Sequence, residues 1–164
     1  MSQDHPPHIF VSVGHELTSH QRYFVDAIDT LLQTQGYMPV TIGRTTEAMA
    51  HPLAVIHDVM VAARGTIIIA FARLAVQTAV EYPAASFARP ITDRTLPTVW
   101  NQIEAAMAAQ AQLPLLLLCQ EELHFEGIID PQVHAIVSFP APITSELPEN
   151  ICHAMLEWLT HSVR

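Results

Sequence analysis

The sequence predicts an α/β protein of three layers, in which a five-stranded, mainly parallel sheet lies between two layers of helices. Short apolar runs alternate along the chain with segments of helical periodicity, and residues 66–71 are apolar throughout, as in a strand buried on both faces. A chain of 164 residues that is 50% hydrophobic is also large enough to bury one core. We therefore expect a single domain over residues 1–164, with residues 1–7 flexible.

Each element of this fold has its own signal in the sequence. Apolar runs bounded by turn-forming residues predict strands at 8–13, 38–42, 66–71, 114–119 and 133–138. Apolar residues at helical spacing predict helices over 18–35, over 52–63, from Pro97 onward and, opened by Ser145 and Pro148, near the end of the chain. Gly36 is a typical helix stop, and Pro39 suggests an edge position for the second strand. Together these elements predict a flavodoxin-like three-layer sandwich.

The connection after the central strand is unusually long. It comprises residues 72–96, whereas such connections usually have about 2–6 residues. In sheets of this kind ligands bind beyond the carboxyl ends of the strands, so we expect residues 72–96 to be a lid or binding loop. The residues expected to meet an anionic ligand such as a nucleotide phosphate at this edge are Arg44, Arg73, Arg89, Arg94 and Tyr82. The alternative is that these arginines are solvated or paired with Glu81 and Asp93.

The helix that begins near Pro97 carries the candidate catalytic group. Proline suits the first position of a helix, and the Ala, Gln and Met residues that follow favour helix formation. A spacing of four residues places Trp100 and Glu104 on one face, which we expect to border a cleft. An adjacent face, expected to pack on the sheet, contains Ile103, Met107 and Ala111. Glu104 is therefore the predicted catalytic residue.

The composition excludes several classes of function. The chain has no lysine, which removes Schiff-base chemistry, a phosphate-loop lysine and the lysine of receiver domains. Its formal net charge of −9 argues against nucleic acid as a partner. No apolar run approaches the ~20 residues that span a bilayer. The start of the sequence lacks a basic region followed by an apolar stretch. We therefore expect a cytoplasmic protein without a membrane partner.

The cysteines and histidines indicate neither a disulfide nor a metal site. Cys119 and Cys152 are expected to be free, buried thiols. The ten histidines contain no His-x-x-x-His spacing, and no Cys-x-x-Cys pair is present. We accordingly expect neither a bound metal nor a cofactor.

The residues around Glu104 resemble two known families. Trp100-Asn-Gln-Ile-Glu104, followed by Leu113-Pro114 and an apolar strand, is similar to nucleoside 2-deoxyribosyltransferases and related nucleotide N-glycosidases. The same segment resembles the Trp-x-x-x-Glu motif of TIR domains, whose glutamate is needed to cleave NAD. Residues 9–13 resemble the opening strand of both families, which share a flavodoxin-like fold. The departures from the transferases are Gln112-Leu113 for Gly-Lys, Arg64-Gly65 for an acidic residue, and Ala105 for a common glycine.

This resemblance implies cleavage or transfer at the N-glycosidic bond of a nucleotide, with Glu104 as nucleophile toward ribose C1′. A glutamate with an ordinary pKa near ~4.3 is ionised at neutral pH and needs no activating base. Trp100 is expected to stack on the base or nicotinamide, and Asn101 to bind a ribose hydroxyl. The residues expected on the phosphate or ribose side are Ser12, Gly14 and His15. NAD and nucleoside phosphates are the candidate substrates, and no acid that would protonate a leaving base is evident.

Two other functions stay open from the sequence. One is a non-catalytic module of the same fold that binds or senses a nucleotide, which the missing acidic residue before the central strand allows. The other, a flavodoxin-like electron carrier, is disfavoured because the connection after Val13 lacks a Ser/Thr-rich loop for a flavin phosphate. Similarity to the deoxyribosyltransferases implies a homo-oligomer, and similarity to TIR domains implies an effector of bacterial antiviral defence.

Overall fold

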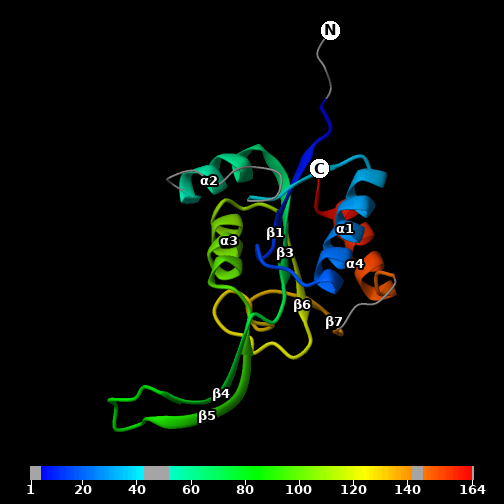
Figure 1. Ribbon diagram of the computed structural model, residues 1–164. Helices are drawn as coiled ribbons and strands as arrows, with labels where there is room; N and C mark the ends of the chain where they lie inside the picture. The colour runs from blue at the N-terminus through cyan, green and yellow to red at the C-terminus, as the bar shows by residue number, and fades with distance from the viewer. Residues whose placement is uncertain (1–4, 43–51, 142–145, 164) are drawn as a thin grey trace.

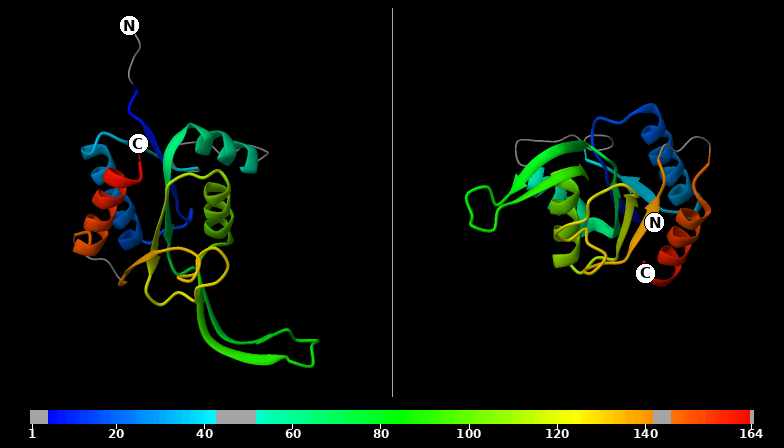
Figure 2. Two further views of the ribbon diagram at one scale, coloured as in Figure 1. Left: turned by 180° about the vertical axis from the view of Figure 1, so that it is seen from behind. Right: turned by 90° about the horizontal axis from the view of Figure 1, so that it is seen from below.

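The computed structural model describes residues 5–42, 52–141 and 146–163, and its elements form three layers (Figure 1). The middle layer is a parallel sheet whose strands, in spatial order, are β2 (Met38–Val40), β1 (His8–Ser12), β3 (Ala63–Ala70), β6 (Leu115–Gln120) and β7 (Ile136–Phe139). One face carries α1 (Ser19–Thr34) and α4 (Glu149–His161), and the opposite face carries α2 (Pro52–Ala62) and α3 (Val99–Gln110), as both views in Figure 2 also show. The predicted α/β fold is confirmed, with β2 at an edge as Pro39 indicates.

The core occupies both faces of the central strand β3. Ile67 and Ile69 pack toward α1 and α4, whereas Ile68 packs on the side of α3. This two-sided burial explains why the strand is apolar throughout. Gly65 allows α4 to approach the sheet, because a Cβ atom at this position would lie 2.8 Å from a ring carbon of Trp158.

Two strands begin at positions that differ from the predictions. β3 already includes Arg64 and Gly65, which the sequence places before the strand. β7 begins later than predicted, at Ile136. The chain just before it turns, because the backbone N–H of Val133 donates to the carbonyl of Asp130 at 2.8 Å.

The first turns of α1 and α3 are both capped by threonine. The Thr18 hydroxyl accepts from the Gln21 backbone N–H, and the Gln21 side chain accepts from the Thr18 N–H in return, which makes a capping box. The Thr98 hydroxyl accepts from the Asn101 N–H at 3.4 Å. The expectation that Pro97 opens α3 is wrong by two residues, since Thr98 is the cap and the helix begins at Val99.

The same two helices end with one backbone motif but different residues. In each, two successive N–H groups after the helix donate to carbonyls of its last turn, and the residue at the turn has a positive φ. In α1 this residue is Gly36, at φ 83°, so the predicted stop is confirmed. In α3 it is Gln112, at φ 55°. The nucleoside 2-deoxyribosyltransferases, which this segment resembles, have glycine at that position.

The segment predicted to be a lid or binding loop folds into an antiparallel hairpin. Its strands are β4 (Leu74–Glu81) and β5 (Arg89–Leu96), which pair from Leu74 opposite Leu96 to Glu81 opposite Arg89. They form a sheet of their own and extend beyond the three layers from the carboxyl edge of the central sheet (Figures 1 and 2). We refer to residues 74–96 as the arm.

The two cysteines differ in their surroundings. Both are free. Cys119, in β6, is fully buried, and this burial raises the pKa of its thiol to about 12. Cys152, in α4, is partly exposed, so the expectation that both thiols are buried is wrong for Cys152.

Some expectations concern the ends of the chain and its relation to membranes. Residues 1–4 and Ser145 lie outside the described residues, and residues 5–7 have no regular secondary structure. Within the part of the chain that is described, no helix combines the length and the apolar character that crossing a bilayer requires.

Candidate functional site

A cleft of about 910 Å³ opens at the carboxyl ends of β1 and β3. Its walls come from the connection between β1 and α1, the residues after β3 and the first turns of α3. The side chains in it that bear on chemistry are Ser12, His15, Arg73, Thr98, Trp100 and Glu104. This is the edge at which folds of this kind bind ligands, and the volume lies within the ~300–1,000 Å³ of small-molecule sites.

Glu104 reaches the cleft from the side of α3 that packs on the sheet. Its residue is only 7% exposed. The buried residues of α3 are Asn101, Glu104, Ala105 and Ala108. The expectation that Ile103, Met107 and Ala111 face the sheet is therefore only partly right: Met107 is half-buried and packs against the cluster that includes Phe10 and Ala63, whereas Ala111 is exposed. Alanines let the helix backbone approach β3 closely, and this approach carries the carboxylate into the protein.

A chain of hydrogen bonds fixes the Glu104 carboxylate. The Asn101 side-chain nitrogen donates to Ser12 Oγ at 3.1 Å and lies 3.4 Å from the Ile69 carbonyl, so the amide joins the ends of β1 and β3. Because Ser12 Oγ accepts this bond, its own proton is free to point at Glu104, with which Ser12 is hydrogen-bonded. We refer to Asn101, Ser12 and Glu104 as the carboxylate relay.

Burial changes the protonation of Glu104. Removal from water raises its pKa from the ordinary 4.5 to about 7, while the hydrogen bond from Ser12 acts in the opposite direction by stabilising the charged form. The expectation of a glutamate with an ordinary pKa is therefore wrong. At pH 7 the protonated and ionised forms of Glu104 are present in similar amounts, so this carboxyl group can serve either as a base or as an acid.

The cleft also has groups that suit an anion. Thr18 and Thr98, the caps of α1 and α3, both line it, so the amino ends of two helices border the same space. Arg73, also in the lining, is exposed and adds a positive charge. Thr18, Gln21 and Thr98 were not among the predicted site residues. The Thr18-x-x-Gln21 capping signature before an apolar run is a sequence signal that identifies this helix start.

The cleft brings together most of the predicted binding residues. Those that line it are Ser12, Gly14, His15, Arg73, Trp100 and Glu104. Trp100 is exposed, so its ring is accessible to a ligand in the cleft. Gly14 lies against the cap of α3, since a Cβ atom there would be in ordinary contact with Thr98 at 3.4 Å.

Three predicted binding residues are placed differently. Asn101 is 1% exposed and is not part of the lining, so it holds Ser12 rather than facing a ribose hydroxyl. Tyr82 is exposed in the turn of the arm, where its ring centroid lies 5.2 Å from that of Phe87. Arg44 lies outside the described residues.

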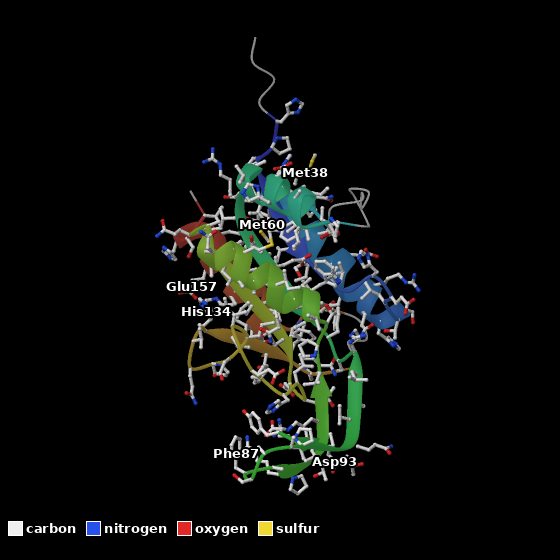
Figure 3. The ribbon with its side chains drawn as sticks, turned by 90° about the vertical axis from the view of Figure 1, so that its left-hand side faces the viewer. Met38, Met60, Phe87, Asp93, His134 and Glu157 are labelled. Carbon is white, nitrogen blue, oxygen red and sulfur yellow. The ribbon has the colours of Figure 1, made fainter. Side chains whose placement is uncertain are left out.

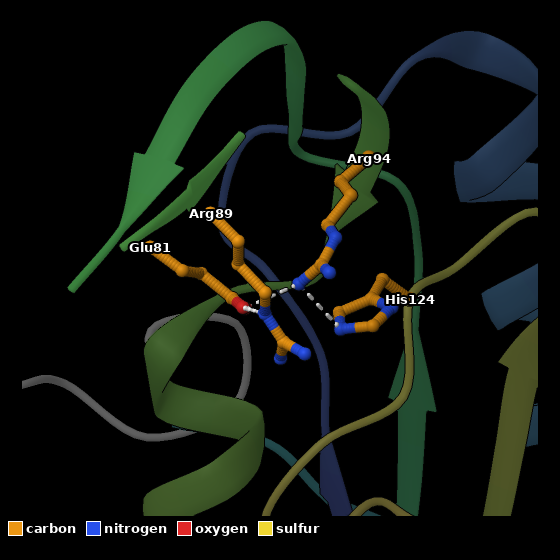
Figure 4. A network of polar contacts seen from close by, with 4 residues as sticks. All are labelled: Glu81, Arg89, Arg94 and His124. Atoms are coloured by element: carbon orange, nitrogen blue, oxygen red, sulfur yellow. Dashed lines mark hydrogen bonds and ion pairs between the residues drawn. The ribbon is translucent and has the colours of Figure 1, made fainter. Parts of the chain in front are cut away.

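The other two arginines of the long segment are engaged in ion pairs. Arg89 and Arg94 both donate to the carboxylate of Glu81, the latter at 2.8 Å (Figure 4). Arg94 also lies 3.0 Å from His124 Nε2, which ties the base of the arm to the loop after β6. The alternative considered from the sequence, that these arginines pair with Glu81, is thus observed for Arg89 and Arg94. We refer to these four residues as the arm network.

In residues 5–42, 52–141 and 146–163, no three His, Cys, Asp or Glu side chains come together as metal ligands.

The fold and the cleft define a three-layer α/β protein with a cleft at the carboxyl ends of its strands. No protein-family model matches the chain, and a search of curated proteins finds no match. Among solved structures the chain resembles the CMP N-glycosidase BcmB of Clostridium botulinum. The identity is 10% and the TM-score 0.56, over 93% of this chain and 99% of that one. At this identity the likeness shows a shared fold.

Proposed function

We propose that this protein cleaves the N-glycosidic bond of a nucleotide, with Glu104 as the nucleophile. The observation that carries the proposal is a buried carboxylate, fixed by Ser12 and opening on a cleft of nucleotide size. The shared fold with a CMP N-glycosidase supports it, because the same architecture serves that chemistry in another protein.

The proposed reaction proceeds in two displacements. An oxygen of ionised Glu104 bonds to ribose C1′ as the C1′–N bond breaks, and the base leaves with that electron pair and takes a proton from water. Water then attacks C1′, loses a proton and releases the Glu104 carboxylate. Ser12 keeps a hydrogen bond on the carboxylate, and Asn101 prevents the serine hydroxyl from turning away. A nucleoside acceptor in place of water gives transfer by the same route.

The residues that line the cleft suggest which parts of a substrate they bind. The caps of α1 and α3 and the guanidinium of Arg73 suit the phosphate. Trp100, one helical turn before Glu104, suits stacking on the base. A nucleoside monophosphate carries an anionic group and an aromatic base on one ribose, so it matches both kinds of contact. NAD remains the second substrate of the proposal, since its nicotinamide leaves as a neutral group.

The test is release of free base from a panel of nucleoside monophosphates, deoxynucleosides and NAD, followed by liquid chromatography. We expect Glu104→Gln to lower kcat by about 10³-fold or more with little change in nucleotide affinity, because glutamine is isosteric but is not a nucleophile. The matched control is Glu16→Gln, which alters another carboxylate of the cleft and is expected to retain activity. Equal release by wild type and Glu104→Gln contradicts the proposed nucleophile.

A nucleotide-binding module without turnover is the second candidate. The raised pKa of Glu104 favours it, because a protonated carboxyl group binds a ligand by hydrogen bonding without attacking it. Calorimetric binding of CMP or NAD, with no base released at pH 6 or pH 8, supports this candidate. A defence role and a homo-oligomer stay predictions from the family resemblance.

A further inference from the structure

Beyond its base, the arm is largely uncovered in the part of the chain that the structure describes. All residues of β4 are exposed except Val76 and Glu81, which are half-buried, and most of the outer half of β5 is exposed as well. β4 and β5 pair only with each other in the described sheets. An isolated two-stranded hairpin is marginally stable in water, so an arm of this length gains stability from a further surface that covers it.

Apolar side chains are concentrated on this uncovered arm. Those of Leu74, Val80, Tyr82 and Phe87 are among the large hydrophobic side chains that the structure exposes. Tyr82 and Phe87 contact each other at the turn, and Phe87 lies at the far end of the arm from the body in Figure 3. Paired aromatic residues that protrude from a surface are the type of residue that anchors protein interfaces.

The arm also differs from the rest of the chain in charge. Residues 74–96 contain two arginines and two acidic residues, so the whole formal charge of −9 falls on the remainder of the chain. Residues 82–88 carry no charged side chain. Two acidic bodies repel each other, whereas a neutral arm approaches an acidic body without that cost. A second copy of this chain is therefore a partner whose charge the arm fits.

The base of the arm fixes its direction. The His124 backbone N–H donates to the Thr95 carbonyl at 2.8 Å, and Arg94 lies 3.0 Å from His124. The Arg73 N–H donates to the Leu96 carbonyl at 2.9 Å. These contacts keep the arm pointing away from its own body. With eight residues in each strand, the arm reaches about 26 Å.

We propose that the arm is a dimerisation element that packs on the body of a second copy, with the two copies exchanging arms about a two-fold axis. In such an interface the same two surfaces meet twice across the two-fold axis. No equivalent surface is left for a third copy, so assembly stops at the dimer. The 23 residues of one arm (96 − 74 + 1) match the ~20–30 residues per partner of a stable interface.

The first test is sedimentation of the full chain over a range of concentrations. Wild type is expected at twice its mass of 18.1 kDa. The double variant Tyr82→Ser/Phe87→Ser is expected to weaken the dimer by about 100-fold or more, with an unchanged circular dichroism spectrum. The matched control is Val61→Ser on α2, since Val61 and Phe87 are 66% and 67% exposed. Val61→Ser is expected to remain a dimer, and dissociation of this control to the same extent contradicts a specific role of the arm.

A second variant removes the outer arm without disturbing the fold. Thr78 and Thr92 are directly paired, so residues 79–91 can be replaced by Asn-Gly, which closes a two-residue hairpin turn. This variant keeps the contacts of Arg94 and Thr95 with His124 and is expected to be a monomer. A dimer that persists without the outer arm, or a wild type that is monomeric at ~100 µM, overturns the proposal.

Cross-linking then identifies what the arm touches. A photoreactive phenylalanine analogue at position 87, in a mixture of isotopically labelled and unlabelled chains, is expected to link labelled to unlabelled copies. Links confined to a single chain contradict arm exchange, because they place the tip of the arm on its own body. None of these measurements depends on enzymatic activity. They therefore test the role of the arm independently of the proposed function.

Discussion

The carboxylate relay and the arm network each centre on one glutamate held by hydrogen bonds, but they differ in their exposure to water. In the relay, Glu104 is buried and accepts from the neutral hydroxyl of Ser12, and its pKa rises through burial. In the arm network, Glu81 is half-buried, more exposed than Glu104, and meets two guanidinium groups, and its pKa falls, chiefly through its hydrogen bond with Arg89.

This comparison separates polar contacts that serve function from those that serve structure. Water screens the charges of the arm network, so the network holds strands in register at little gain in stability. The relay lacks that screening, so ionised Glu104 carries an uncompensated cost until a ligand enters the cleft. Of the two glutamates, the one that the fold destabilises is the one available for chemistry.

The largest predicted effect on folding follows from this cost. With a folded pKa of about 7 against an ordinary 4.5, Glu104 keeps its proton in the folded state where the unfolded chain has lost it, so stability falls as pH rises between these values. Glu104→Gln is expected to raise the free energy of unfolding by about 3 kcal/mol above pH 7 and to have little effect below pH 4.5. Urea unfolding at pH 4.5, 6 and 8 measures this difference.

The matched substitution for this experiment is Glu16→Gln, which removes a carboxylate of the cleft that is exposed to water. It is expected to leave the pH dependence of stability unchanged. A gain in stability for Glu104→Gln that is equal at all three pH values indicates an effect other than ionisation, and contradicts a buried, protonated Glu104.

A smaller effect is expected from loosening the relay while keeping its carboxylate. Ser12→Ala removes the hydrogen bond that favours the ionised form, so the pKa of Glu104 should rise further, by about one pH unit. If Glu104 is the nucleophile, kcat/KM of wild type rises with pH through a midpoint near pH 7 and levels off above it, and the midpoint moves upward in the variant. Base release across pH 5–9 tests the midpoint, and NMR titration of the Glu104 carboxyl carbon tests the pKa without activity.

Asn101→Leu should move the same midpoint in the same direction, because the Asn101 amide is hydrogen-bonded to the Ser12 hydroxyl that meets Glu104. Ser138→Ala, in the edge strand β7 and outside the cleft lining, is the control and should leave the midpoint unchanged. If kcat/KM falls in Ser12→Ala while the midpoint stays constant, Ser12 contributes to packing or substrate binding and not to the ionisation of Glu104.

The smallest effect is predicted for the arm network. Because the pKa of Glu81 is lowered, its contribution to stability is present above the ordinary value and is lost as pH falls through the lowered value. Glu81→Gln should therefore reduce stability at neutral pH by less than the relay variants change it, and added salt should shrink the effect. Thermal unfolding of Glu81→Gln at low and high salt measures this effect. A loss of stability as large as that from removing a buried contact shows that the arm is covered in solution.

The elements of the fold could be predicted because burial leaves a periodic trace in the sequence. The apolar run of β3 and the Gly36 stop are such traces, and both are confirmed. The arm was missed although β4 contains the β-branched residues Val76, Thr78 and Val80 in alternation. The connection between β4 and β5 carries no two-residue turn signature such as Asn-Gly, and most of the arm lacks the buried face that gives a strand an apolar pattern.

The site could be predicted only in part. The spacing of Trp100 and Glu104 identified two residues of the cleft. The sheet-facing side of α3 was partly misplaced because the prediction gave weight to the large side chains of Ile103 and Met107, whereas close packing on β3 selects the small ones. The relay joins residues 89 positions apart, and the pKa of Glu104 depends on burial, so neither leaves a local pattern in the sequence.

Alkylation of Cys119 can report when the central sheet opens to solvent. Its thiol is fully buried in β6 and has a pKa of about 12, so at neutral pH it offers a reagent almost no thiolate and no access. Cys152, being partly exposed, reacts without such opening. In a single sample, the slower alkylation rate, that of Cys119, therefore measures how often the central sheet opens to the reagent. The faster rate, that of Cys152, measures the reactivity of the reagent itself.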